Sequence, residues 1–324
     1  MGIKHGFVSG VADGTDTAQV RPSNWNSNHT IDSEVTFPAV AAPPVPLAAT
    51  FNLFGKTLGN TRIMAAVVGP SGMDYPLQPS MWRQKIGRWN PPGNAATVPG
   101  VDGLPAMTIV GTATARTTAT TNLLTRMRRL GAVSVATAAG IASLRNAAAF
   151  TAGNATPAIG GGFFVSFRFA ASDAAAVAGA RMFVGMDAVA PTNVEMDTRL
   201  NHFGIAQIST DATQLFLVFG GSAAQARVAL GVGFPIHNGA VGLTTGVPYD
   251  LTIWCPPNLN GVFSWQLDRL DTQTSTGGTV TPATVGTQTP LGTTLLAPSM
   301  FRTNNATALA VGLDTSSIYT ETDF

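Results

Sequence analysis

Short segments in the second half of the chain alternate between apolar and polar residues. From Phe163 to Phe169 every second position holds phenylalanine or valine, and Ser166 and Arg168 lie between them. A period of two predicts a strand with one buried face. Segments rich in β-branched and aromatic residues and bounded by turn formers extend this prediction to about nine strands. They are Phe163–Ala170, Arg181–Met186, His202–Ile208, Gln214–Phe219, Arg227–Phe234, Tyr249–Cys255, Val262–Leu270, Thr293–Phe301 and Ala308–Tyr319.

The predicted strands follow one another closely, and no helical segment separates them from residue 160 onward. Asp211, Ala212 and Thr213 lie between two of them and predict a hairpin loop. The series predicts a mainly β protein with a C-terminal antiparallel β-sandwich or jelly roll. No repeat of fixed period is present, which argues against a solenoid or a propeller.

The first half of the chain has a different pattern. Residues 1–35 are polar and rich in turn formers, and residues 36–48 carry Pro38, Pro43, Pro44 and Pro46, which predict a stiff extended arm. Residues 49–120 are broken by Gly-Pro and Pro-Pro-Gly turns and are expected to form a turn-rich intermediate region. The sandwich domain is expected to span residues 121–324.

Residues 121–150 permit two interpretations. Leu123, Leu124, Met127 and Leu130 have helical spacing, whereas residues 131–138 are rich in glycine and β-branched residues. A short helix and a pair of strands both fit, and we favour the strands.

Composition indicates an oligomer. Only 11% of the residues are charged, against roughly 25% in an average soluble domain. Hydrophobic residues make up 45% of the chain, and 35 glycines and 21 prolines accompany them. A soluble chain with so few charges is expected to bury part of its surface against other subunits.

The net charge of +1 conceals an uneven distribution. Residues 1–74 hold four bases and five acids (−1), residues 75–172 hold nine bases and one acid (+8), and residues 173–324 hold five bases and eleven acids (−6). We favour the interpretation that basic and acidic faces of neighbouring segments or subunits meet. The alternative is a cationic patch for an anionic partner such as a phosphorylated glycan or nucleic acid.

A second candidate for binding is the aromatic and basic group around Trp82 and Trp89, which flank Arg83, Lys85 and Arg88. Such a mixture can stack on sugars or bases. More often the aromatic side chain belongs to the core and the arginines form its solvated rim, which is the interpretation we favour.

Motifs of catalysis, metal binding and membrane insertion are absent from the sequence. Cys255 is the single cysteine and is expected to be buried, and the four histidines are far apart, so no zinc-site spacing occurs. No P-loop, dinucleotide fingerprint or nucleophile elbow is present. The beginning, MGIKHGFVSG, lacks the apolar core of a signal peptide, and no apolar run is long enough to span a bilayer. We therefore expect no enzyme, no cofactor, no membrane insertion and synthesis in a cytoplasm.

One acidic loop remains as a low-ranked site. Asp187, Asn193, Glu195 and Asp197 lie between two predicted strands. Their oxygens could hold calcium, or a carboxylate pair could hydrolyse a glycosidic bond. We favour a solvated loop, because the acids do not have the spacing of an EF-hand calcium loop. Loops at the ends of the sandwich are the expected place for any ligand contact.

The N-terminal residues carry a family resemblance. The sequence His5-Gly6-Phe7-Val8-Ser9, then Asp13-Gly14, Val20-Arg21-Pro22-Ser23, Trp25-Asn26 and His29, resembles the N-terminal stretch of tail fibre and related structural proteins of tailed bacteriophages. The resemblance implies attachment to the virion through residues 1–35, with Arg21, Pro22, Trp25, Asn26 and His29 as the contacts. It also implies a homotrimer with a concanavalin-like or lectin-like C-terminal sandwich. No heptad or collagen-like shaft is visible, so the fibre should be short.

The leading hypothesis is therefore a phage virion structural protein, a short tail fibre or tail appendage made in the cytoplasm of the bacterial host. Its partners would be its own copies and other tail or baseplate proteins, without nucleic acid. Its sandwich could bind polysaccharide on the host surface, which would then be the receptor. A carbohydrate-binding module dedicated to receptor recognition is the alternative, and a glycan depolymerase using Asp187, Glu195 or Asp197 ranks third.

Overall fold

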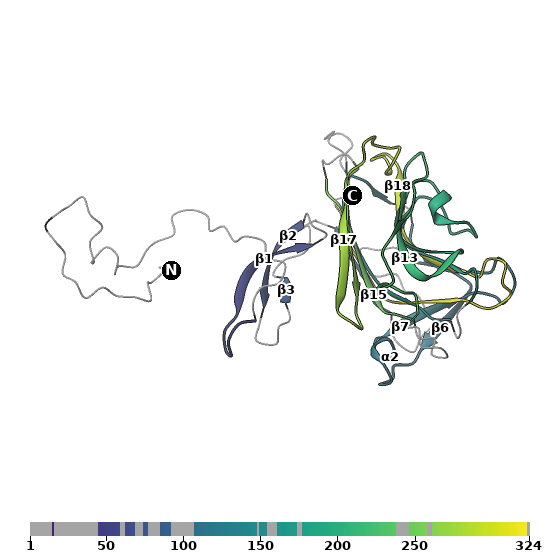
Figure 1. Ribbon diagram of the computed structural model, residues 1–324, viewed down its shortest axis with the longest axis horizontal. Helices are drawn as coiled ribbons and strands as arrows, with labels where there is room; N and C mark the ends of the chain where they lie inside the picture. The colour runs from purple at the N-terminus through teal and green to yellow at the C-terminus, as the bar shows by residue number, and fades with distance from the viewer. Residues whose placement is uncertain are drawn as a thin grey trace.

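The protein is built from antiparallel strands. The computed structural model describes Thr15 and residues 45–58, 62–68, 74–76, 85–91, 107–147, 149–153, 161–173, 177–237, 246–257 and 261–322. These residues form two eight-stranded sheets and one three-stranded sheet. In Figure 1 the two large sheets, one with β15 and β17 and the other with β13 and β18, form the two layers of a sandwich. The predicted fold class, a mainly β protein with an antiparallel sandwich, is confirmed.

The first large sheet has the strand order β17, β16, β15, β10, β19, β7, β6, and β4 also pairs with β19. Its strands are β17 (Thr274–Val280), β16 (Phe263–Arg269), β15 (Tyr249–Cys255), β10 (Phe163–Ala171), β19 (Gly312–Thr322), β7 (Arg129–Val133), β6 (Thr112–Arg116) and β4 (Lys85–Trp89).

The second large sheet has the order β14, β13, β12, β11, β18, β8, β5, and β9 also pairs with β18. Its strands are β14 (Val228–Ala229), β13 (Asp211–Gly220), β12 (His202–Ile208), β11 (Arg181–Asp187), β18 (Leu295–Thr303), β8 (Ile141–Arg145), β5 (Thr108–Val110) and β9 (Phe150–Thr151). The small sheet consists of β1 (Asn52–Leu58), β2 (Arg62–Val68) and β3 (Asp74–Pro76). The helical elements are α2 (Leu123–Arg126) and the short η1 (Met196–Thr198).

The hydrophobic core lies between the two large sheets. Phe203 of β12 stacks on Phe263 of β16, with ring centroids 4.5 Å apart, so the two layers are in direct contact. Phe163 of β10 packs edge-on against the same Phe263 ring at 6.0 Å. Burial of a phenylalanine side chain contributes about 1.5–3 kcal/mol, so these rings supply much of the driving force that joins the layers.

Several predicted elements differ from the structure in detail. The hairpin between β12 and β13 turns at Ser209 and Thr210, because Asp211 already pairs with Ile208. The prediction of a loop at Asp211, Ala212 and Thr213 was therefore two residues late. The strand expected over Arg227–Phe234 shrinks to β14. Residues 121–150 contain both alternatives, the short helix α2 and the strands β7 and β8.

The sandwich also includes residues that precede 121. Strands β4, β5 and β6 come from the segment 49–120, which we expected to be a turn-rich intermediate region, and they belong to the two large sheets. The chain passes from β5 in one layer to β6 in the other through Gly111, whose φ of 85° favours glycine. The described part of the proline-rich arm begins at Val45.

A buried ion pair closes one end of the core. Arg302 of β18 is fully buried, and its Nε donates to Asp173 Oδ1 at 2.8 Å, just beyond the end of β10. The Nη1 of Arg302 donates to Gln207 of β12 at 2.5 Å, and the backbone N–H of Gly312 donates to Asp173 Oδ1 at 2.7 Å. The network therefore ties strands of the second sheet to both central strands of the first.

The pKa of Asp173 shows which influence prevails there. Burial alone would raise it, but the charge of Arg302, the nearby His237 and the hydrogen bonds from Arg302 and Gly312 lower the pKa of Asp173 below its ordinary value. Asp173 is thus an ionised partner that Arg302 requires.

We expect Asp173→Asn to lower the free energy of unfolding by about 3–5 kcal/mol, because it leaves the buried Arg302 charge without a counter-charge. Urea unfolding followed by tryptophan fluorescence measures the change. The matched control is Asp197→Asn, whose partner Arg227 is exposed, and it should cost at most about 1 kcal/mol. Equal losses in the two variants would contradict the importance given to the buried pair.

Candidate binding groove

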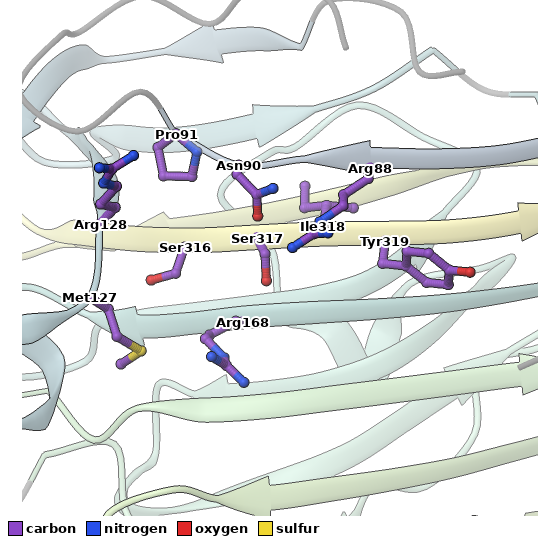
Figure 2. Close-up of a pocket in the computed structure, with 10 residues that line it drawn as sticks. All are labelled: Arg88, Asn90, Pro91, Met127, Arg128, Arg168, Ser316, Ser317, Ile318 and Tyr319. Carbon is purple, nitrogen blue, oxygen red and sulfur yellow. The ribbon is translucent and has the colours of Figure 1, made fainter. Parts of the chain in front are cut away.

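An open groove lies on the face of the first sheet that points away from the core. Its volume is about 850 Å³, within the range of about 300–1,000 Å³ that is common for small-molecule sites. The residues that line it are Arg88, Asn90, Pro91, Met127, Arg128, Arg168, Ser316, Ser317, Ile318 and Tyr319 (Figure 2).

The groove forms where strand pairing along β19 is interrupted. On one side, β19 pairs with β7 over Gly312–Thr315 and then with β4 over Ile318–Thr322. No described strand pairs with Ser316 and Ser317 on that side. The chain leaves β4 at Asn90 and Pro91 and enters β7 from Met127 and Arg128, so the groove opens between these two segments.

A β-bulge on the other side of β19 shapes the groove floor. Arg168 of β10 pairs with Ser317, but the next residue, Phe169, pairs with Thr315, so Ser316 is an extra residue. Bulges change the direction of side chains and increase local twist, and they are common beside binding sites. Here the bulge lies at the same position as the break in pairing.

Three arginines reach the groove, and their surroundings differ. Arg168 makes a bidentate pair with Asp250 of β15, with Nε–Oδ1 at 2.7 Å and Nη2–Oδ2 at 2.6 Å. Arg88 and Arg128 are exposed, and neither forms an ion pair with any described residue. None of the ten lining residues is acidic. The groove therefore offers positive charge to a ligand.

Tyr319 supplies a neutral aromatic wall. Its hydroxyl donates to Glu321 Oε1 at 2.8 Å, and its ring packs edge-on against Phe164. Burial, the hydrogen bond to Glu321 and the charge of Glu321 all raise the pKa of Tyr319, so the phenol keeps its proton at neutral pH. The groove thus combines cations, hydroxyls and one aromatic side chain, a set suited to binding polar anionic molecules.

The structure also places the acidic residues expected from sequence. Asp187 Oδ2 lies 3.1 Å from Arg199 Nε, Glu195 Oε1 accepts from Arg181 Nε at 2.7 Å, and Asp197 pairs with Arg227. Each carboxylate has its own arginine, so the three are not brought together. No cluster of three or more potential metal ligands occurs among the described residues.

Other sequence expectations have mixed outcomes. Arg21, Pro22, Trp25, Asn26 and His29, the expected attachment residues, lie outside the described residues, as does Trp82. Trp89 is buried in the core while Arg88 is exposed, as the favoured interpretation of that segment predicted. Cys255 is buried as expected. Among the described helices, none is long and apolar enough to cross a membrane.

Much of the charge asymmetry is resolved inside one chain. Arg116 and Arg129, from the basic middle segment, both bind Asp314 in the acidic end, at 2.9 and 2.8 Å. The pair of Arg168 with Asp250 joins the same two segments. These pairs fit the favoured interpretation, in which basic and acidic faces of neighbouring segments meet. Arg88 and Arg128 form no ion pair with a residue that the structure describes.

Sequence reasoning did not identify most of the groove. Arg88 was recognised beside Trp89, but Arg128, Arg168 and Tyr319 were not, because they meet only through the pairing of β19 with distant strands. The available signal was the cluster Arg126, Arg128 and Arg129, three bases within four residues that interrupt a mostly apolar stretch.

Comparisons with known proteins give similarity only at the level of solved structures. No protein-family model matches the sequence, and no curated protein matches it. A protein of unknown function from Shewanella oneidensis is 12% identical, covering 72% of this chain and 84% of its own, with a TM-score of 0.45. Lectin II from Ulex europaeus is 14% identical, covering 74% and 98%, with a TM-score of 0.45. Peanut lectin bound to a peptide is 12% identical, covering 73% and 97%, with a TM-score of 0.44.

Asp187 and His202, on adjacent strands, are two buried ionisable residues whose pKa values are shifted. Asp187 lies opposite His202 of β12, and both side chains are fully buried. Burial, which outweighs the nearby Arg199, raises the pKa of Asp187 to about 6. Burial, with the positive charge of Arg199, lowers the pKa of His202 to about 3. Between about pH 4 and 6 the folded chain therefore holds a neutral pair, whereas the unfolded chain holds two charged groups.

We expect the two residues to have opposite effects on the pH dependence of stability between pH 4 and 6. In Asp187→Asn, the unfolded chain binds a proton at His202 that the folded chain does not, so stability should rise with pH. In His202→Gln, the folded chain retains a proton at Asp187 that the unfolded chain has lost, so stability should fall as pH rises. Each slope should approach about 1.4 kcal/mol per pH unit relative to wild type. Urea unfolding at several pH values measures both, and slopes of the same sign would refute the pairing.

Proposed function

We propose that the chain is a virion structural protein of a tailed bacteriophage, a short tail fibre or tail appendage that is attached through its N-terminal segment. The support is the set of N-terminal residues that resembles the attachment stretch of phage tail proteins, with Arg21, Trp25 and His29 among the proposed contacts. The β-sandwich that follows provides a rigid body with a binding face.

The sandwich is proposed to bind saccharide on the host surface. The observation that carries this proposal is the open groove beside β19, where arginines, hydroxyls and an amide line a volume of about 850 Å³. Saccharides present many hydroxyl groups, and such groups are bound by Arg, Asn and Ser side chains, which donate and accept hydrogen bonds. Host attachment follows from joining this groove to a virion anchor.

A dedicated carbohydrate-binding module remains the second candidate, since the same groove supports it. The two functions differ in what residues 1–35 do. A depolymerase using Asp187, Glu195 or Asp197 gains no support from the geometry, because each of these carboxylates is occupied by a separate arginine.

The attachment proposal is tested in particles of the phage that encodes the chain. Trp25→Ala should reduce the amount of this chain in purified particles, measured by quantitative mass spectrometry. Ser317→Trp should leave incorporation unchanged but reduce adsorption to host cells, because the indole fills the groove. Thr112→Trp, on exposed β6 outside the groove, is the matched control and should affect neither. Absence of the wild-type chain from purified particles would remove the virion role.

We further propose that the sandwich assembles as a homotrimer, because a surface with so few charges is expected to be covered by other copies. Analytical ultracentrifugation of the full chain should give a trimer that persists on dilution to low micromolar concentration. A stable monomer over that range would contradict the proposal.

A further inference from the structure

We infer that the groove beside β19 selects acidic saccharides, with Arg88 and Arg128 each holding an anionic group and Ser317 and Asn90 binding neutral hydroxyls. The inference rests on the proposed saccharide-binding function and names the class of saccharide that the groove accepts. It depends on the placement of the arginines, on which of them are already paired and on the absence of acids from the groove lining.

Arg88 and Arg128 approach the groove from separate segments. Arg88 belongs to β4 and lies opposite Tyr319 in the strand register, whereas Arg128 lies just before β7. In Figure 2 the Arg88 side chain extends over Ser317, and Arg128 lies beside Pro91 near Ser316. In the same view Pro91 and Asn90 lie between the two arginine side chains, so the two cations are separated. Two separated cations suit a chain with repeated anionic groups better than a single small anion.

Arg168 has a different role from these two. Asp250 occupies its Nε and Nη2, so the pair has little net charge, and its Nη1 makes no hydrogen bond to Asp250. In Figure 2 the guanidinium of Arg168 lies on the opposite side of Ser317 from Arg88. Such an arrangement provides a fixed donor for a neutral oxygen rather than a third site for an anion.

No lining residue opposes an anion. Two carboxylates lie two positions from a lining residue: Glu321 is fully buried and accepts the Tyr319 hydroxyl, and Asp314 is held by Arg116 and Arg129. Asp250 is held by Arg168. Among the described residues no carboxylate pairs with Arg88 or Arg128, so an anionic ligand meets their positive charge, and a neutral ligand of the same shape does not receive this attraction.

The lining favours a saccharide over a nucleic acid. Single-stranded nucleic acids bind through successive aromatic side chains on which the bases stack, together with many phosphate contacts. Tyr319 is the single aromatic residue of the groove lining, and its ring packs against Phe164. Ser316, Ser317 and Asn90 instead offer hydrogen bonds that match sugar hydroxyls.

The first experiment compares ligands that differ only in charge. Isothermal titration calorimetry of the full chain would use an oligogalacturonide and its methyl-esterified neutral form, then dextran sulfate and dextran. The acidic member of at least one pair should bind about tenfold more tightly than its neutral form, and the difference should shrink in high salt. An oligodeoxynucleotide of random sequence should compete poorly with the acidic saccharide.

The second experiment assigns the effect to the two arginines. Arg88→Gln and Arg128→Gln should each weaken binding of the acidic saccharide roughly five- to tenfold while leaving the affinity for the neutral form unchanged. Arg126→Gln is the matched control, because it removes the same charge as the other two substitutions. Arg126 is exposed and close to Arg128 in sequence, but it does not line the groove. The effect of Arg126→Gln should be less than about twofold.

The outcomes separate this inference from the proposed function. Equal affinity for acidic and neutral forms, or equal effects of Arg126→Gln and Arg128→Gln, would overturn acidic selection while saccharide binding stands. Competition by the oligodeoxynucleotide at equal affinity would show a general polyanion site and also overturn it. Binding of none of the four saccharides would remove both the inference and the saccharide part of the proposed function, without affecting the virion role.

Discussion

The backbone of β19 sets the constraint on which the first sheet and the groove both depend. A strand inside a sheet must find hydrogen-bond partners on both sides, because buried peptide groups without partners are costly. β10 pairs with β19 along one side. On the other side β19 pairs first with β7 and then with β4. Where one partner has ended and the next has not begun, the sheet surface opens beside Ser316 and Ser317. The groove is thus a consequence of how β19 is paired.

Charges keep this arrangement in register. Asp314 of β19 binds Arg116 of β6 and Arg129, the first residue of β7, which fixes the position at which β7 begins. At the beginning of β19, the N–H of Gly312 joins the Asp173 and Arg302 network, which reaches the second sheet. Ion pairs of this kind contribute modestly to net stability, but removal of one partner is costly. Their main effect here is to specify one pairing among several that a threonine- and serine-rich strand would permit.

The local sequence pattern was sufficient to predict most strands after residue 160, because apolar and polar residues alternate within each of these segments. The limits of β12 and β15 coincide with those of the predicted strands. β17 was missed because its sequence TSTGGTV has a single apolar residue, and this edge strand is largely exposed. The strand expected over Arg227–Phe234 was too long, since Gly231 and Gly233 interrupt it and Val232 is 80% exposed. The apolar residues of this segment gave the sequence pattern of a buried strand, but most of the segment is exposed in the structure.

The groove could not be predicted from the sequence for a different reason. Arg116 and Asp314, which form one of the ion pairs that hold this part of the sheet, are 198 positions apart in the sequence. No local sequence pattern indicates a contact between residues so far apart. The same limit applied to the boundary of the sandwich, because β4 is recognised as part of it only through its bonds to β19.

The position of the groove also has a functional consequence. Sequence alone pointed to loops at the ends of the sandwich as the place for ligand contact, whereas the groove is floored by paired strands. Side chains on strands lose little conformational freedom when a ligand binds, because packing and pairing have already ordered them. Arg168 illustrates this: its fork is fixed by Asp250 before any ligand arrives. Arg88 and Arg128 lack such partners among the described residues, so ordering on binding is confined to the two side chains that supply the charge. A rigid floor with two adjustable cations can accept anionic groups at slightly different spacings, and it discriminates by charge more strictly than by the detailed shape of the saccharide.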